Sequence, residues 1–293
     1  MAEAKVGIIG GSGLGDALCR DVQDPGVEVA TPFGQPSDAI IETTWGDTPV
    51  AVLNRHGPGH LIGPSQVNYR ANIYALKALG CTHVIASGAV GSLREEIKPK
   101  DIVIPDQAID KTHRRIGTFF DDFLAVHVEL SSPFCQVLRE HLISCDPDIS
   151  ADLHDSGTYV CMEGPAFSSR AESEMHRMWG GDLIGMTVMP EAKLAREAEL
   201  AYAMVCLPSD YDCWRPVGAD LDKHELLSEI IENLNEATVN AIELIKAAVT
   251  SFGRIADIPS MAHSALELAI WSDRESIAPA AREHFGVLVE KYL

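Results

Sequence analysis

Short strand-like runs alternate with helix-like segments along the first 250 residues, and this alternation restricts the possible fold more than any other feature. Strands that are joined through helices pack into sheets covered by helices, so the pattern predicts an α/β domain with a mixed, twisted β-sheet flanked by helices. The runs predicted as strands are Lys5–Ile9, Ile40–Thr43, Val50–Asn54, His83–Ala86, Asp101–Ile104, Thr158–Met162, Leu183–Met186 and Tyr202–Cys206.

Apolar residues recur at helical spacing in the segments between these strands. Ser65 is predicted to cap a helix that Gly80 ends. Ser169–Trp179 and Glu191–Leu200 are shorter helix candidates, and the longest candidate extends from about His224 to Thr250.

Two regions depart from the alternation. Residues 105–157 are rich in charge, His and Pro, which predicts long loops with a role in function or subunit contacts. Residues 253–293 predict a C-terminal helical extension, because so short a segment rarely forms a core of its own. The chain is therefore divided into a domain of residues 1–252 and an extension of residues 253–293.

The charge balance excludes several kinds of partner. Acidic residues outnumber basic residues 43 to 23, which gives a formal net charge of −20. Nucleic acids and anionic membranes are bound mainly through Lys and Arg, so neither is expected as a partner. No apolar run approaches the roughly 20 residues of a membrane-spanning helix, and the first strand begins too early to leave room for a signal peptide. The seven cysteines are widely spaced and include no CxxC pair, which argues against a disulfide framework and predicts a cytoplasmic globular protein.

The first predicted strand leads directly into the glycine-rich sequence GIIGGSGLG. Glycine lets backbone N–H groups approach an anion closely, and Ser12 adds a hydroxyl donor. A dinucleotide motif is excluded because Asp16 occupies its third glycine position, and a Walker loop is excluded because Asp16-Ala17 replaces its Lys and hydroxyl residue. The loop predicts a small oxyanion site, with an ordinary tight turn as the alternative.

Two further loops follow predicted strands and carry groups suited to an anion. Arg55 can hold phosphate through paired hydrogen bonds and His56 offers another donor, although Arg55 on a solvated surface loop is the alternative. The spacing of His56 and His60 suits zinc only on a helix, which the intervening Gly-Pro-Gly prevents, so no metal site is expected. The third loop consists of the small residues from Ser87 to Gly91. Strand ends gather in one crevice of an α/β sheet, so the three loops are expected to converge.

Asp210 and Asp212 follow an apolar strand and have aromatic neighbours. In an extended segment both carboxylates project to the same side. Burial of one carboxyl group beside another raises its pKa and can produce a proton donor at neutral pH. The alternative is a solvated acidic turn.

A series of motifs occurs in order over about residues 5–250: GIIGGSGL, TPFGQPSDA, RHGPGH, PSQVNYRANIYALK, GSLREEIKPKDIVIPDQAID, MEGPAFSSRAES, MTVMPEAKLAREA and SDYDCW. Together they resemble the methylthioadenosine phosphorylases of the trimeric purine nucleoside phosphorylase family. The resemblance implies a layered phosphorylase fold and the phosphorolysis of S-methyl-5′-thioadenosine to adenine and 5-methylthioribose 1-phosphate. It also implies inorganic phosphate as co-substrate, no cofactor, and a homotrimer or a dimer of trimers.

The resemblance assigns roles to individual positions. Met186 would lie under the ribose, Phe167 would pack on the purine, and His127 would reach the 5′-substituent pocket of the neighbouring subunit. Asp210 would be the catalytic acid toward N7 of adenine, while Asp212 would accept a hydrogen bond from the 6-amino group. The phosphate-binding positions would be Ser12, Arg55, His56, Gly88, Ala89 and Thr187.

Two positions depart from the family pattern. Gly88 stands where relatives often have threonine, and Ala166 stands where an arginine is common. Two other functions stay open: a broader purine nucleoside phosphorylase that acts on adenosine or inosine, and a nucleotide-binding protein that lacks the chemistry.

Overall fold

The computed structural model describes residues 4–11, 14–18, 25–145, 147–215 and 222–293. In this part of the chain, ten strands form one mixed sheet with the order β2-β3-β1-β4-β10-β5-β7, and β9, β8 and β6 branch from β4. The strands are β1 (Lys5–Gly10), β2 (Ile41–Trp45), β3 (Thr48–Asn54), β4 (Cys81–Ser92), β5 (Ile102–Val103), β6 (Gln107–Asp110), β7 (Leu153–His154), β8 (Thr158–Cys161), β9 (Leu183–Gly185) and β10 (Ala201–Asp210).

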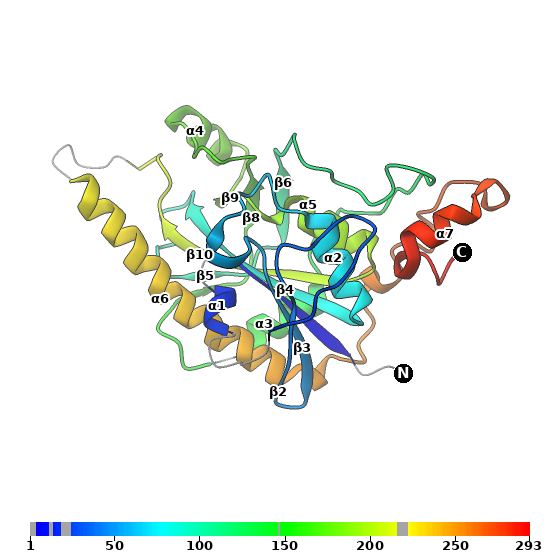
Figure 1. Ribbon diagram of the computed structural model, residues 1–293. Coiled ribbons are helices and arrows are strands. Elements are labelled where there is room, and N and C mark those ends of the chain that lie inside the picture. Colours follow the sequence, from blue (N-terminus) through cyan, green and yellow to red (C-terminus); the bar gives the residue numbers. More distant parts are fainter. Residues whose placement is uncertain (1–3, 12–13, 19–24, 146, 216–221) are drawn as a thin grey trace.

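Helices cover both faces of the sheet, as Figure 1 shows. They are α1 (Leu14–Leu18), α2 (Tyr69–Ala78), α3 (Gln136–Ser144), α4 (Arg170–Met178), α5 (Val188–Glu197), α6 (Lys223–Thr250) and α7 (Pro279–Phe285). The buried residues of α1, α3 and α6 share one hydrophobic cluster, and those of α2, α5 and the C-terminal segment share another. The predicted α/β class, with a mixed sheet flanked by helices, is confirmed.

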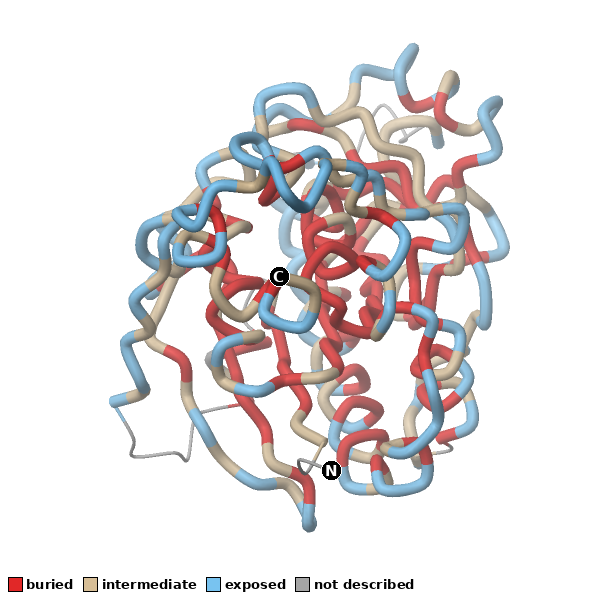
Figure 2. Tube along the Cα trace, turned by 90° about the vertical axis from the view of Figure 1, so that its right-hand side faces the viewer, coloured by how far each residue is buried: buried red, intermediate tan, exposed pale blue. Residues whose placement is uncertain are grey.

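The central strands are apolar along their whole length because each of their faces meets a helix layer. In β10, Ala203 and Val205 belong to the cluster that includes α6, whereas Tyr202 and Met204 belong to the cluster on the α5 side. Figure 2 shows buried residues concentrated along the sheet and the inner faces of the helices. Each strand predicted from the sequence overlaps a strand of this sheet.

Residues 105–157, which were predicted as long loops, also contain regular structure. Strands β6 and β7 lie within this region and pair in parallel with β8 and β5. Helix α3 lies there as well, and its buried residues include Arg139 and His141. Charged and polar side chains on the buried face interrupt the apolar periodicity, so the sequence pattern did not indicate a helix.

The predicted cap of α2 is also wrong. The helix begins after Asn68, whose side-chain oxygen accepts from the backbone N–H of Ala71 at 3.1 Å. The hydroxyl of Ser65 donates instead to the carbonyl of Glu163 at 3.0 Å. The other end is as predicted, since Gly80 follows the helix with φ of 83°.

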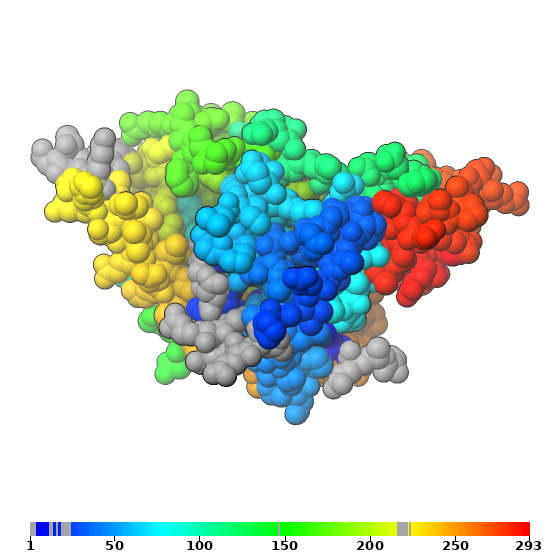
Figure 3. All heavy atoms as spheres, viewed as in Figure 1, coloured from blue at the N-terminus to red at the C-terminus, as the bar shows by residue number. Residues whose placement is uncertain are grey.

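The C-terminal segment packs on the domain that precedes it. Leu266, Phe285 and Leu288 belong to the same hydrophobic cluster as α2 and α5. In the space-filling view this segment forms one side of the molecule (Figure 3). The division of the chain at residue 252 stays a prediction. Among the described helices, none is both long enough and apolar enough to cross a membrane.

Candidate active site

The three loops predicted to converge do meet at one edge of the sheet. Strands β1, β3, β4 and β10 run parallel, so their carboxyl ends lie together. The backbone N–H of Arg55 donates to the carbonyl of Gly10 at 3.0 Å, and that of Gly11 donates to the Ser87 hydroxyl at 3.2 Å. Farther along β4, Gly91 pairs with Asp210 of β10. Ser12 lies outside the described residues.

Arg55 is fully buried, which excludes the alternative of a solvated surface arginine. Its Nε and Nη2 atoms donate to the two carboxylate oxygens of Glu191 at 2.7 and 2.9 Å, and its Nη1 donates to the carbonyl of Ser87 at 2.8 Å. Burial lowers the pKa of Arg55, but the Glu191 carboxylate raises it more, so the net shift is upward. The positive charge of Arg55 is already balanced by Glu191. A bound anion would therefore be held largely by hydrogen bonds.

Gly88 and Thr187 are neighbours beside this arginine. A Cβ atom added at Gly88 would lie 3.3 Å from the Thr187 hydroxyl oxygen and only 2.8 Å from Cε of Met204. Thr187 is buried at the start of α5, and Ala89 follows Gly88 on β4. Met204 therefore occupies the space that a threonine at position 88 would need.

His56 does not supply the donor predicted from the sequence. Its Nδ1 lies 2.8 Å from the carbonyl oxygen of Ile62, which can only accept, so Nδ1 carries the proton. Burial and the neighbouring Arg55 lower the pKa of His56 to about 4, so the ring is neutral at pH 7. The Nε2 atom of a neutral ring in this tautomer is an acceptor, and it can bind only a protonated oxygen of phosphate.

The paired aspartates do not form the extended arrangement predicted from the sequence. Strand β10 ends at Asp210, and Asp212 has a left-handed backbone with φ of 49°. This turn lets the backbone N–H of Asp212 donate to Oδ1 of Asp210 at 2.7 Å. Both residues are half-buried above Gly91, where an added Cβ would lie 3.3 Å from Oδ1 of Asp210. The pair is thus held by hydrogen bonds in a turn at the sheet edge, half-buried rather than fully solvated.

The raised pKa within this pair belongs to Asp212, whereas the resemblance assigns the catalytic acid to Asp210. Burial raises the pKa of Asp212, and the Asp210 carboxylate raises it further. The hydroxyl of Ser173 on α4 donates to Oδ2 of Asp212, and the hydroxyl of Ser209 donates to Oδ2 of Asp210 at 2.8 Å. These bonds orient both carboxyl groups.

The segments that carry Met186 and Phe167 touch each other. A Cβ added at Gly164 would lie 2.5 Å from the Met186 sulfur, and Gly164 has φ of 69°, so glycine is required there. Phe167 follows in the same loop with 85% of its surface exposed, beside the exposed Ala166. An exposed ring of this size is available to pack on a planar ligand.

His127 lies apart from the other predicted site residues in the structure. It is exposed, its backbone N–H donates to the carbonyl of Ala269 at 2.9 Å, and its ring meets that of Trp271 at 5.2 Å. Val126 and Ile270 form an antiparallel bridge beside it. The structure places His127 against the C-terminal segment rather than among the strand ends.

Four residues that the sequence did not indicate contact the predicted site residues or their segments: Ser173, Glu191, Glu163 and Arg115. Glu191 had a weak signal, because a single acidic residue within an apolar helix is expected to have a buried partner. Arg115 had none, since it stands in a charged run that resembles a solvated loop.

The described residues contain no group of three His, Cys, Asp or Glu side chains able to hold a metal ion. His56 and His60 stack with ring centroids 4.3 Å apart. The absence of a metal from the reaction stays a prediction.

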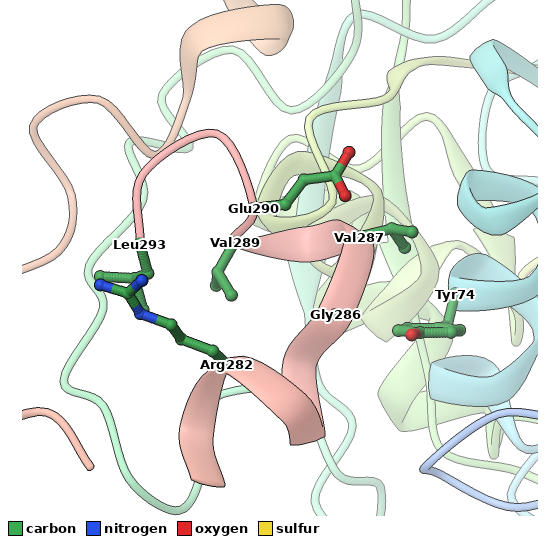
Figure 4. A pocket seen from close by; sticks show the side chains of 7 residues that line it. All are labelled: Tyr74, Arg282, Gly286, Val287, Val289, Glu290 and Leu293. Atoms are coloured by element: carbon green, nitrogen blue, oxygen red, sulfur yellow. The ribbon is translucent and has the colours of Figure 1, made fainter. Parts of the chain in front are cut away.

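A separate cavity of about 510 Å³ lies between α2 and the C-terminal segment (Figure 4). It contains none of the predicted site residues. Its lining consists of Tyr74, Arg282, Gly286, Val287, Val289, Glu290 and Leu293.

The layered fold, and the cluster of possible anion-binding groups around Arg55 and Thr187 at its sheet edge, agree with a comparison to known families. The sequence profile of the Phosphorylase superfamily matches residues 5–250, and the chain belongs to this superfamily. Among its relatives, the S-methyl-5′-thioadenosine phosphorylase of Thermosynechococcus vestitus is 45% identical, with 99% of each chain covered. The S-methyl-5′-thioadenosine phosphorylase of Anopheles gambiae is 47% identical, with 84% of this chain and 91% of that protein covered.

Solved structures lead to the same group. A methylthioadenosine phosphorylase from an antarctic soil metagenomic library is similar with a TM-score of 0.86 and 42% identity, over 98% of this chain and 99% of that chain. The methylthioadenosine phosphorylase of Schistosoma mansoni in complex with adenine is similar with a TM-score of 0.78 and 39% identity, over 86% of this chain and 93% of that chain.

Proposed function

We propose that this protein is a pentosyltransferase that cleaves S-methyl-5′-thioadenosine with inorganic phosphate, giving adenine and 5-methylthioribose 1-phosphate. The observation that carries the proposal is the position of two unlike groups at one sheet edge. The constrained pair of Asp210 and Asp212 suits a purine, and the cluster around Arg55 and Thr187 suits phosphate. Relatives that bear this activity in their names match nearly the whole chain.

On the phosphate side, we assign binding to Ser12, Arg55, His56, Gly88, Ala89 and Thr187. Glu191 already balances the charge of Arg55, so phosphate would keep most of its negative charge. That charge stabilises the positive charge that develops on the ribosyl group as the C1′–N9 bond breaks. A phosphate oxygen then forms the new bond to C1′, with Met186 beneath the sugar.

On the purine side, we assign Phe167 to packing, Asp210 to protonation of N7 and Asp212 to the 6-amino group. Adenine leaves poorly as an anion, so a proton must reach N7 during bond breaking. Burial and the neighbouring Asp210 carboxylate raise the pKa of Asp212, which supports the presence of a proton at the purine edge of the site. Ser173 occupies one oxygen of Asp212 and leaves the other to accept from an amino group. This arrangement favours 6-aminopurines over inosine, while adenosine stays an alternative substrate.

We further propose a homotrimer or a dimer of trimers, in which His127 contributes to the 5′-substituent pocket of an adjacent subunit. The exposure of His127, and of Trp271 and Leu268 at 73% and 89% in the segment beside it, supports a contact surface there. A cytoplasmic location and a role in purine and methionine salvage follow from the same proposal. The free thiols of the six described cysteines, Cys81, Cys135, Cys145, Cys161, Cys206 and Cys213, are compatible with a reducing compartment.

Chromatography of adenine released from methylthioadenosine tests the proposal, with and without phosphate and with a chelator. We expect release to require phosphate, to survive the chelator, and to be faster than hypoxanthine release from inosine. The Asp210→Asn variant, purified in parallel, controls for contaminating phosphorylase. Undiminished release without phosphate, or its loss with chelator, would overturn the assignment.

A further inference from the structure

Arg115 is a buried cation in the irregular segment between β6 and α3, and only 2% of its side chain is exposed. The nearest carboxylate, that of Glu163, is 3.4 Å from its Nε. The shorter bonds of the guanidinium go to backbone carbonyls. Nη1 donates to Met186 and Met189, each at 2.6 Å, and Nη2 donates to Glu163 at 2.7 Å.

These carbonyls belong to the two segments on which the proposed reaction depends. Met186 and Met189 flank Thr187 at the start of α5. Glu163 begins the loop that leads through Gly164 to Phe167. A single planar guanidinium therefore connects the phosphate and ribose segment with the purine segment.

Glu163 anchors the arginine from the other side. Its carboxylate accepts from the backbone N–H groups of His113 and Arg114 at 2.8 and 3.2 Å, and also from the hydroxyl of Ser65. Burial alone would raise the pKa of Glu163, but these hydrogen bonds and Arg115 lower it to about 2. The carboxylate is thus charged at all working pH values, and it holds residues 113–115 in one conformation.

We propose that Arg115 is a positioning residue, which holds the segment Met186–Met189 at a set distance from the purine loop. This inference rests on the proposed function, in which the segment Met186–Met189 binds phosphate and ribose while the loop from Glu163 to Phe167 binds the purine. Reacting atoms must come within about 3–3.5 Å, and a displacement of about 1 Å can reduce the rate by roughly 100-fold. In this role Arg115 acts on the backbone carbonyls of both segments rather than on the substrate.

The Arg115→Lys substitution distinguishes a role that depends on the charge of Arg115 from one that depends on the geometry of its guanidinium group. The ammonium group of Arg115→Lys keeps the positive charge beside Glu163, but its donors share one nitrogen and cannot span the carbonyls of both segments. A purely electrostatic role would survive this substitution. A positioning role would not.

Arg139 provides a matched control. It is also buried, and its guanidinium donates to the carbonyls of Pro105, Ile104 and Asp155 at 2.8, 3.2 and 2.5 Å. Those carbonyls lie outside the predicted site segments. Arg139→Lys therefore measures the general cost of replacing a buried arginine that joins backbone segments.

The test compares wild type, Arg115→Lys and Arg139→Lys in steady-state kinetics and thermal unfolding. We expect similar losses of unfolding temperature in both variants. Only Arg115→Lys should lower kcat for methylthioadenosine by roughly 10- to 100-fold and raise the KM for phosphate by about tenfold. Wild-type kcat and KM in Arg115→Lys, or the same kinetic change in Arg139→Lys, would overturn the proposal.

Calorimetry distinguishes this failure from a failure of the proposed function. Phosphate and adenine are titrated separately into the three proteins, and we expect Arg115→Lys to bind each about tenfold more weakly than wild type. If wild type binds both ligands but releases no adenine, the proposed function fails and these affinities still decide the role of Arg115. Equal affinities in wild type and Arg115→Lys refute the positioning role, and a wild type that binds neither ligand refutes both proposals.

Discussion

Replacing Glu191 with glutamine removes one charge from an ion pair that is completely shielded from water. The side chains of Arg55 and Glu191 are both 0% exposed and are joined by two parallel hydrogen bonds of 2.7 and 2.9 Å. The hydroxyl of Tyr202 donates to the same carboxylate at 2.8 Å. Glutamine has nearly the same volume as glutamate, so the substitution changes charge and hydrogen bonding without opening a cavity.

The loss of stability follows from the buried cation that stays behind. Removing one partner of a buried pair costs about 3–5 kcal/mol, because the remaining charge is neither solvated nor compensated. At about 2 °C per kcal/mol for a chain of this size, the unfolding midpoint should fall by roughly 6–10 °C. Phosphate should reduce this loss, since a bound anion stabilises the folded state and would supply the missing negative charge beside Arg55.

Thermal unfolding with and without phosphate measures both effects. The matched control is Glu236→Gln, which breaks an exposed pair with Lys100 whose N–O distance is 2.7 Å. Glu236 is 44% exposed, so its substitution should cost at most about 1 kcal/mol. Equal midpoints for Glu191→Gln and Glu236→Gln would show that Arg55 does not depend on Glu191 for charge compensation, and a loss in Glu191→Gln that phosphate does not reduce would contradict anion binding beside Arg55.

Three further substitutions test the assigned roles and one buried carboxyl group. Asp210→Asn should lower kcat/KM for methylthioadenosine by roughly 10²–10⁴-fold and raise the relative activity on inosine, because the amide can donate to O6 or N7; wild-type turnover would show that another group is the acid. His127→Ala should reduce kcat/KM for methylthioadenosine more than for 5′-deoxyadenosine, since the face of an imidazole ring can pack on a thioether, and equal losses would contradict the shared pocket. Burial raises the pKa of Glu197 from its ordinary 4.5 to about 7, so the stability gained from its protonated form is present below pH 4.5 and is lost as the pH rises through 7. As the pH rises from 5 to 8, the unfolding temperature of wild type should therefore decrease relative to that of Glu197→Gln. If the unfolding temperatures of the two proteins change in parallel with pH, the shift in pKa is disproved.

The sequence was sufficient to predict those structural features that are determined by interactions between neighbouring residues. The central strands could be predicted because strands covered on both faces are apolar along their length. Helix α4 was also predicted, within Ser169–Trp179, and it begins with a capping box that joins Ser169 and Glu172, only three residues apart. The glycine-rich loops and the paired aspartates were recognisable as well, because each directly follows a strand and parallel strands bring their carboxyl ends to one edge.

Tertiary structure alone decided the partners of the buried charges. Arg55 and Glu191 lie 136 positions apart, and Arg115 reaches carbonyls more than 45 positions away. Helix α3 escaped prediction for a related reason, since Arg139 on its buried face is acceptable only where distant carbonyls accept its hydrogen bonds. Local periodicity describes the interactions of a residue with its neighbours over one or two turns. The burial, protonation and orientation of a charged group depend instead on dielectric surroundings and partners that exist only after distant segments have packed together.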